Sequence, residues 1–371
     1  MKILGFIKKE PVLSAAILLA AVSSFFVPPD REYIEYIDFR TLALLLCLML
    51  IVAMLQSAGV LRTLAQLLMK HVSAEAGVVF VLVMLCFFSS KLITNDVALI
   101  TFVPFSFSVL SLMKSEDRLR LIVPVTVLQT VAANLGSMLT PPGNPQNLHL
   151  HGASGMSVGD FMLLMAPYTA ASFLLLCPAI LLCSKKGSSV AVQAEAAKIS
   201  DKPRALLGAA LFVLCLLCVA RVIDWRLTLA LVLAICAASD IKTFKRVDYT
   251  LLLTFIGFFI FIGNMERIPA FSSYIRGVIG GRECITAVLS SQIISNVPAA
   301  LLLSGFTDNY RELIVGVNIG GLGTLIASMA SLISFKYIAA EEKPLRGKYI
   351  LSFTLYNLAF LAALIILYII L

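Results

Sequence analysis

The stretch SSKLITNDVAL, residues 89–99, holds side chains that could bind an ion inside an apolar surrounding. Thr94, Asn95 and Asp96 offer a hydroxyl, a carboxamide and a carboxylate in three consecutive positions. Such oxygens can hold a coupling cation, and the carboxylate of Asp96 can instead carry a proton. A second interpretation is that Asp96 caps the helix beginning VALITF. The segment therefore predicts a site for an ion or a proton, with capping as the structural alternative.

A base precedes this acid by five residues. Lys91 could complete a site for an anion, or it could neutralise Asp96 across the turn. The second role is favoured, because one ammonium without a second base is weak support for an anion site. A charge at the centre of a bilayer costs about 2.5–3.5 kcal/mol, so both residues indicate function.

The stretch NLGSMLTPPGNPQNL, residues 134–148, interrupts a long apolar run with prolines and glycines. Freed backbone groups must find partners in lipid, so such a break persists only inside protein or along a polar cavity. Gly143, Asn144 and Asn147 are therefore candidates for lining a binding site. Gln129 and Asn134, on the preceding helix, are predicted to make hydrogen bonds between helices.

The composition of the whole chain shows whether these residues lie in a water-soluble protein or in a membrane. Of the 371 residues 60% are hydrophobic and 13% are charged, mean hydropathy is +0.97, and long apolar runs recur throughout. This composition predicts an all-α polytopic membrane protein. The net charge of +8 comes from short basic clusters between apolar runs, which argues against nucleic-acid binding. No nucleotide-binding or hydrolase motif stands in a suitable context, so an enzyme is not expected and no cofactor is predicted.

Two of the apolar runs, 76–113 and 283–307, are predicted to be hairpins that enter and leave the membrane on one side. The runs 121–150 and 311–335 are predicted to be broken membrane helices. With every other run crossing once, 20 of the 29 lysine and arginine residues fall on one face. Positive residues mark the cytoplasmic side, so the N-terminus is predicted to be cytoplasmic and the C-terminus periplasmic.

The two halves of the chain align with each other. ITND at 93–96 matches ISNV at 294–297, and the break beginning at Asn134 matches NIGGLGTLIASMAS from Asn318. We therefore expect inverted-topology repeats, 37–183 and 247–371, after an N-terminal membrane helix within 1–36 and separated by a cytoplasmic linker and connecting helices within 184–246. The second repeat adds the following candidate binding residues: Ser295, Asn296, Thr324, Ser328 and Ser331.

His149 and His151 follow the first break and are predicted to form a surface pair near the outer mouth. A pH sensor is the alternative for this pair. Their spacing of two residues does not place them on one helix face, which argues against a metal site.

At TNDVALITFVP, NLGSMLTPPGNPQNL, SQIISNVPAALLL and NIGGLGTLIASMASLIS the sequence resembles the ion transporter superfamily, which includes citrate-transporter-like proteins, sodium symporters of divalent anions and arsenite permeases. The likeness is strongest to anion permeases of bacterial inner membranes and covers most of 37–371. It implies an elevator-type homodimer, with amphipathic arms at 60–74 and 267–281. It also implies substrate ligands at the hairpin tips and a possible sodium ion near Asn95 and Asn296. Asp96 and Val297 depart from the carboxylate symporters, and the Asn-Asp pair looks more like the arsenite permeases.

Taken together, these features predict a secondary active permease for a small anion in a bacterial inner membrane, coupled to protons or sodium by alternating access. The alternative is proton-coupled efflux of a metalloid, or sodium/proton antiport centred on Asp96. An ion channel and an intramembrane enzyme are disfavoured, because neither a continuous polar pore nor a paired nucleophile and base is visible.

Overall fold

The computed structural model describes residues 10–70, 72, 74–185 and 199–371, and these ranges are helical with no strand among them. The basic N-terminus and most of the polar linker expected over 184–204 lie outside the described residues. The described chain is thus the all-α protein that the composition predicts.

Seven helices in the described part of the chain are long and apolar enough to cross a membrane. They are α4 (Phe39–Ser57), α6 (Glu75–Ile93), α8 (Ser115–Ser137), α10 (Val158–Cys183), α11 (Lys202–Val219), α13 (Tyr249–Glu266) and the segment Lys343–Ile370, which joins η3 (Lys343–Leu345) to α19 (Arg346–Ile370). The prediction of a polytopic membrane protein is confirmed by these spans.

The remaining helices are shorter. They are α2 (Pro11–Ser23), α3 (Glu32–Glu35), α5 (Val60–Met69), α7 (Asn95–Leu110), η1 (Pro141–Gly143), α9 (Pro145–Ser154), α12 (Trp225–Ser239), η2 (Ile241–Arg246), α14 (Pro269–Ile279), α15 (Glu283–Ile294), α16 (Asn296–Ser304), α17 (Tyr310–Ile319) and α18 (Met329–Glu341). The N-terminal helix expected within 1–36 corresponds to α2, which ends at Ser23, ahead of two prolines at 28 and 29 that disfavour a helix.

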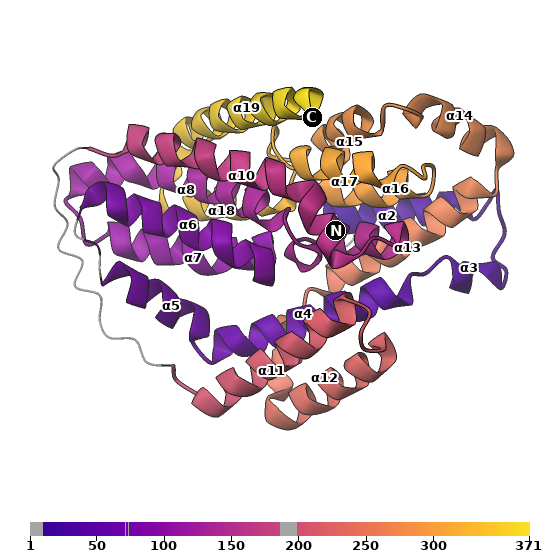
Figure 1. The fold of residues 1–371 in the computed structure, drawn as a ribbon, viewed down its shortest axis with the longest axis horizontal. Coiled ribbons are helices and arrows are strands. Elements are labelled where there is room, and N and C mark those ends of the chain that lie inside the picture. The colour runs from indigo at the N-terminus through magenta and orange to yellow at the C-terminus, as the bar shows by residue number, and fades with distance from the viewer. Residues whose placement is uncertain (1–9, 71, 73, 186–198) are drawn as a thin grey trace, which may run out of the picture.

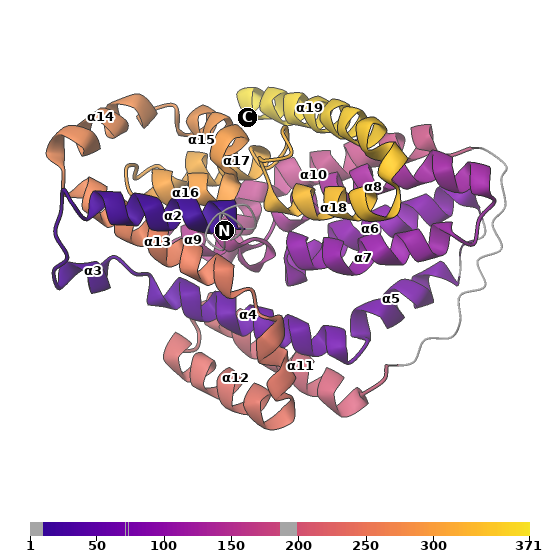
Figure 2. The same cartoon turned by 180° about the vertical axis from the view of Figure 1, so that it is seen from behind.

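The two predicted hairpins lie toward opposite ends of the long axis of the molecule. Figure 1 shows α6, α7 and α8 on one side and α15, α16 and α17 on the other, and the reverse view in Figure 2 agrees. The short helices α5 and α14 lead into the first and second hairpins at these two ends. Both hairpins therefore point their tips toward the middle of the molecule.

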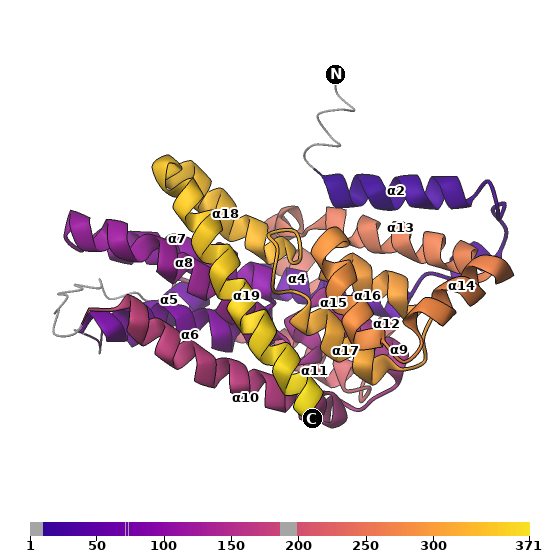
Figure 3. The ribbon, with the colours of Figure 1, turned by 90° about the horizontal axis from the view of Figure 1, so that it is seen from above.

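The helix at the centre of the first half is α8. From Leu121 to Met138 it is buried almost throughout, and it packs on α6, α7, α10, α18 and α19. This helix is covered on all sides, and its buried part also carries the polar side chains Thr126, Gln129, Thr130, Asn134 and Ser137, which need hydrogen-bond partners inside the protein. Seen from above in Figure 3, α19 runs obliquely across this group of helices.

A second group of helices packs around α4. It is contacted by α11, α12 and α13, and α2 lies along α13. Both α4 and α13 begin with a capping aspartate. Asp38 Oδ1 accepts from the backbone N of Thr41 at 2.9 Å, and Asp248 Oδ1 accepts from the backbone N of Leu251 at 3.1 Å.

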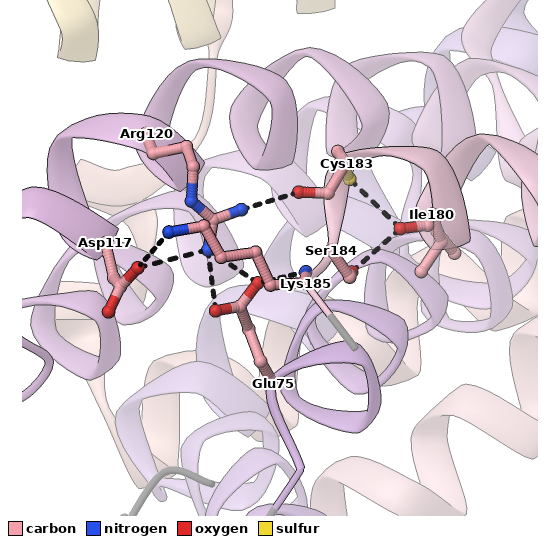
Figure 4. A network of polar contacts seen from close by, with 7 residues as sticks. All are labelled: Glu75, Asp117, Arg120, Ile180, Cys183, Ser184 and Lys185. Atoms are coloured by element: carbon pink, nitrogen blue, oxygen red, sulfur yellow. Dashed lines mark hydrogen bonds and ion pairs between the residues drawn. The ribbon is translucent and has the colours of Figure 1, made fainter. Parts of the chain in front are cut away.

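The start of the first hairpin is fixed by a charged cluster, drawn in Figure 4. Arg120 Nη2 on α8 lies 2.6 Å from both carboxylate oxygens of Glu75, the first residue of α6. Arg120 also donates to the carbonyl oxygen of Cys183 at the end of α10, at 2.9 Å. Glu75 is only 1% exposed, and a buried charge is tolerated when it is paired and hydrogen-bonded in this way. The cluster therefore joins α6, α8 and α10 at one end.

Candidate functional site

Each hairpin turns at a single residue with an unusual backbone. Thr94 joins α6 to α7 with φ 70° and ψ 153°, and Ser295 joins α15 to α16 with φ 74° and ψ 154°. Positive φ is uncommon for a residue that is not glycine, and it is often found at functional sites. The sequence alignment of the two tips thus corresponds to the same local geometry in both halves of the chain.

The two expected helix breaks also have matching geometry. The first separates α8 from α9, and Asn144 precedes α9 in an extended conformation with φ −146° and ψ 149°. The second separates α17 from α18, and Ser328 precedes α18 with φ −138° and ψ 132°. Two helices therefore begin inside the molecule with extended polar residues at their N-termini.

Hairpin and break contact each other in the same way in both halves. The hydroxyl of Thr140 donates to the carbonyl oxygen of Lys91, which lies three residues before the first tip. The hydroxyl of Thr324 donates to the carbonyl oxygen of Gln292, three residues before the second tip, at 3.0 Å. These two hydrogen bonds hold each break against its own hairpin.

Glycine permits the close approach of the same elements. A Cβ on Gly136 would collide with the carbonyl group of Phe87 and crowd the Ser90 hydroxyl. A Cβ on Gly320 would lie 2.8 Å from the hydroxyl oxygen of Ser291. Because Ser90 and Ser291 each stand four residues before a tip, the broken helices pack on the hairpins at corresponding points.

Asn134 is the centre of the polar contacts between the two halves. Its Oδ1 accepts from Asn95 Nδ2 at 2.9 Å and from Ser328 Oγ at 3.0 Å. Its Nδ2 donates to the carbonyl oxygen of Gly321 at 3.4 Å. All three side chains are at least 95% buried. One carboxamide thus joins the first tip to the second break.

Asn318 makes the reciprocal connection. Its Nδ2 donates to Asn147 Oδ1 at 2.7 Å, which joins the second broken helix to the first. Asn147 Nδ2 in turn donates to the carbonyl oxygens of Ser137 and Thr140, at 3.4 and 3.3 Å. These are main-chain acceptors that the break has freed from the helix. Asn147 therefore stabilises the break as well as standing beside the proposed site.

The second tip is tied to the second break through the main chain. The backbone N of Asn296 donates to the carbonyl oxygen of Ala327 at 2.9 Å, and Ser295 Oγ donates to the same oxygen at 3.5 Å.

In the first break, Gly143 cannot carry a side chain, since a Cβ there would collide with the carbonyl group of Ser137.

Several buried polar atoms at the breaks lack a hydrogen-bond partner within the described residues. They include Asn144 Oδ1, Gln146 Oε1 and Nε2, Asn318 Oδ1 and Ser331 Oγ. An unpaired buried polar group costs free energy, and each such atom in a folded protein needs an explanation.

The charged residues of the first hairpin are not arranged as the sequence suggested. Lys91 Nζ lies over the rings of Phe87 and Phe88, 4.4 and 4.7 Å from their centroids. The ion pairs found among the described residues do not include Lys91 with Asp96. The expectation that Lys91 neutralises Asp96 is therefore wrong.

Asp96 instead faces the second group of helices. It lines a cavity of about 140 Å³ together with Gln56 of α4, Arg246 of η2 and Asp248 before α13. Asp96 Oδ1 is buried without a hydrogen-bond partner among the described residues. The backbone N of Asp96 donates to Asn95 Oδ1 at 2.9 Å, whereas the Thr94 side chain makes no capping hydrogen bond to α7. Nothing in the sequence indicated that a second acid lies close to Asp96.

Both histidines after the first break are buried, with 7% of His149 and 1% of His151 exposed. The expectation of a surface pair is therefore wrong.

Gln129, in contrast, makes the predicted contacts between helices, since its Nε2 donates to Ser106 Oγ at 2.8 Å and to the carbonyl oxygen of Leu82 at 3.1 Å. Asn134 and Asn318 were absent from the predicted binding residues, although their alignment in the two halves could have indicated them.

The helices, the two breaks and the two tips define a multi-pass membrane protein with a buried polar crossing point. The model of the citrate transporter family matches residues 3–309. An uncharacterized transporter of Methanocaldococcus jannaschii is 34% identical over 307 residues, which are 82% of each chain. Inner membrane protein YbiR of Escherichia coli is 30% identical over 334 residues, 86% of each chain. The human P protein is 28% identical over 173 residues, 44% of this chain and 20% of the relative.

The family and the names of these relatives indicate a membrane transporter. The chain belongs to the citrate transporter family. The superfamily expected from the sequence motifs is therefore confirmed.

Proposed function

We propose that the protein is a secondary active transporter that moves a small anion across the membrane by alternating access, with protons or sodium as the coupling ion. The observation that carries this proposal is the crossing at Asn134, where the first tip and the second break share one buried carboxamide. Binding sites at the meeting point of two repeats are typical of secondary transporters.

The chemistry of the crossing suits an anion. The helices α7, α16, α9 and α18 all begin there, at the two tips and the two breaks. A helix N-terminus presents free N–H groups and a partial positive charge, so it favours a negatively charged ligand. The family description, citrate transporter, agrees with an anionic substrate.

Coupling to a cation would use the oxygens at the same tips. Asn95 and Asn296 follow the two turns and remain the candidates for a nearby sodium ion, and their carboxamide oxygens are ligands suited to a hard cation. The remaining candidates are Thr94, Gly143, Asn144, Asn147, Ser295, Thr324, Ser328 and Ser331. The helices around α4 and α13 would form the static part, and both hairpins and both broken helices would move, in a homodimer of elevator type with inverted repeats.

A second candidate function is supported by Asp96. Its carboxylate shares a cavity with Asp248, and two acids beside one cavity suit proton-coupled metalloid efflux or sodium/proton antiport. In that case the Asp96→Asn variant would lose flux driven by a proton gradient.

Transport in proteoliposomes tests the two candidates. Purified protein should accumulate labelled citrate or a small oxyanion such as phosphate when a sodium or proton gradient is imposed, and dissipation of the gradient should abolish the accumulation. Citrate and phosphate that stay at the level of empty liposomes under both gradients, together with arsenite flux or sodium/proton exchange that needs Asp96, would replace the first candidate with the second.

A further inference from the structure

His149 lies where four segments of the chain meet. It belongs to α9, and its Nε2 is 3.0 Å from Ser304 Oγ at the end of α16. Its Nδ1 is 3.6 Å from Asp38 Oδ2 at the start of α4. Its ring also packs on Phe259 of α13, with the two ring centroids 5.4 Å apart. A single imidazole therefore contacts α9 and α16 on one side and α4 and α13 on the other.

These segments belong to different parts of the proposed transporter. The helices α9 and α16 carry the first break and the second tip, whereas α4 and α13 belong to the part that stays still. His149 and Asp38 thus face each other across the boundary at which one part would slide past the other. The inference below rests on the proposed function, because it needs these two parts to move.

Asp38 is held as an acceptor at this boundary. Its Oδ1 caps the backbone N of Thr41 at 2.9 Å, and its Oδ2 accepts from the Thr41 hydroxyl at 2.5 Å. Burial acts to raise the pKa of Asp38, but the contacts with His149 and Thr41 outweigh it and hold that pKa below its ordinary value. The carboxylate facing His149 is therefore ionised at neutral pH.

The other groups near His149 do not compete for this role. Ser304 is neutral, and α13 presents the rings of Phe255 and Phe259. On α4, Arg40 points its guanidinium at the carbonyl oxygens of Cys218 and Val219, each 3.4 Å away.

Two groups near the end of α9 complete the surroundings. Arg221 donates to the carbonyl oxygens of His151 and Gly152, at 3.3 and 3.4 Å. His151 packs its ring on Phe161, with the two ring centroids 6.0 Å apart. Asp38 is therefore the acid that faces His149 among the described residues.

We propose that His149 is a proton-binding contact that locks the moving part of the transporter against α4. When the imidazole binds a proton, it becomes a cation facing the Asp38 carboxylate, and the arrangement described here is stabilised. When the proton leaves, the neutral ring keeps its contact with Ser304 but loses the charge attraction.

A double-mutant cycle followed across pH tests this contact. The melting temperatures of the wild type, His149→Gln, Asp38→Asn and the double variant would be measured in lipid nanodiscs at pH 5.5 and pH 8.5. Asparagine caps a helix about as well as aspartate, so Asp38→Asn removes the charge and keeps the cap. We expect His149→Gln to lower the melting temperature by about 2–4 °C more at pH 5.5 than at pH 8.5. We expect this pH-dependent difference to vanish in the Asp38→Asn background.

Two controls separate the charge from packing. Ser304→Ala removes the neutral hydrogen bond and should lower the melting temperature equally at both pH values. Asp248→Asn changes the corresponding cap of α13 and should leave the effect of His149→Gln unaltered. If His149→Gln does not give a monodisperse protein, His149→Asn provides the second variant for the same cycle.

The outcomes distinguish this inference from the proposed function. A loss from His149→Gln that is equal at both pH values, or that persists in the Asp38→Asn background, overturns the lock. If gradient-driven citrate or phosphate uptake is observed in that case, the transport proposal still stands. If the cycle behaves as expected and uptake of these anions is absent, the contact between His149 and Asp38 stands and the transport proposal fails.

Discussion

Asn134 and Asn318 each lie near the end of the helix that precedes a break, and each carboxamide joins its own helix to the opposite half of the chain. Asn134 accepts from Ser328 at 3.0 Å, and Asn318 donates to Asn147 at 2.7 Å. Neither bond could form if the two halves folded and packed independently. The polar crossing is therefore a product of the whole fold.

Asn134→Ala should impair transport more than any other change at a single buried amide. It would leave Asn95 Nδ2 and Ser328 Oγ without their partner, and unpaired buried groups cost about 1–3 kcal/mol each. We expect at least a tenfold loss of gradient-driven uptake in proteoliposomes. Asn357→Ala is the matched control, because Asn357 is also buried but, within the described part of the chain, its amide bonds inside α19, to the carbonyl oxygen of Phe353. Equal losses in the two variants would contradict a special role for the crossing.

Gly136→Ala should prevent the first broken helix from packing on its hairpin, because the added methyl group would collide with the carbonyl of Phe87. We expect loss of the monodisperse peak in size-exclusion chromatography, or a melting temperature lower by several degrees. Gly347→Ala, where the methyl group would meet open space on α19, should be neutral or slightly stabilising. Similar profiles for both alanine variants would show that the close approach does not matter.

Glu75→Gln should destabilise the first hairpin. The amide cannot replace the carboxylate that binds Arg120, and removing one partner of a buried ion pair leaves the other charge without its partner. Because the Arg120 side chain is 28% exposed, water recovers part of the loss, and we expect about 2 kcal/mol. The measurement is denaturant unfolding in detergent, with Glu341→Gln at an exposed position as the control.

The ion pair of Arg267 with Asp30 should respond to pH in the opposite sense to the proposed His149 lock. The hydrogen bond from Arg267 Nη1, at 2.7 Å, is the main cause that holds the pKa of Asp30 below its ordinary value. The pair is therefore intact at neutral pH and is lost only as pH falls through this lowered pKa. Arg267→Gln should have the same small effect on melting temperature at pH 6 and pH 8, and high salt should reduce it. An effect that grows on acidification would contradict this assignment.

Much of the helical framework is predictable from the sequence, because membrane helices are set by the length of apolar runs and their interruptions by proline and glycine. The helices are interrupted at the prolines after Thr140 and in the glycine-rich stretch before Ser328. Local sequence was sufficient there, because proline and glycine disfavour a continuous helix in any surrounding.

Contacts between distant segments could not be predicted in the same way. A charge count along the chain could not place Asp248 beside the cavity of Asp96, because that proximity depends on how α13 approaches the first tip. The contacts of Lys91 and His149 were equally unpredictable from local sequence. Lys91 lies over aromatic rings of its own helix, and His149 is buried by the packing of α4 and α13. Periodicity reports the environment of a residue only when its neighbours in space are also neighbours in sequence.

Each hairpin reverses direction over one residue, Thr94 or Ser295, with the next helix starting at once. A reversal of one residue leaves no loop between the two helices. The tip of the hairpin therefore cannot change conformation unless a helical turn unwinds. A movement of either tip must therefore move both helices of that hairpin together as a rigid unit. The flexing points then lie at the far ends, near Ser111 and Gly305, where the outgoing helices stop.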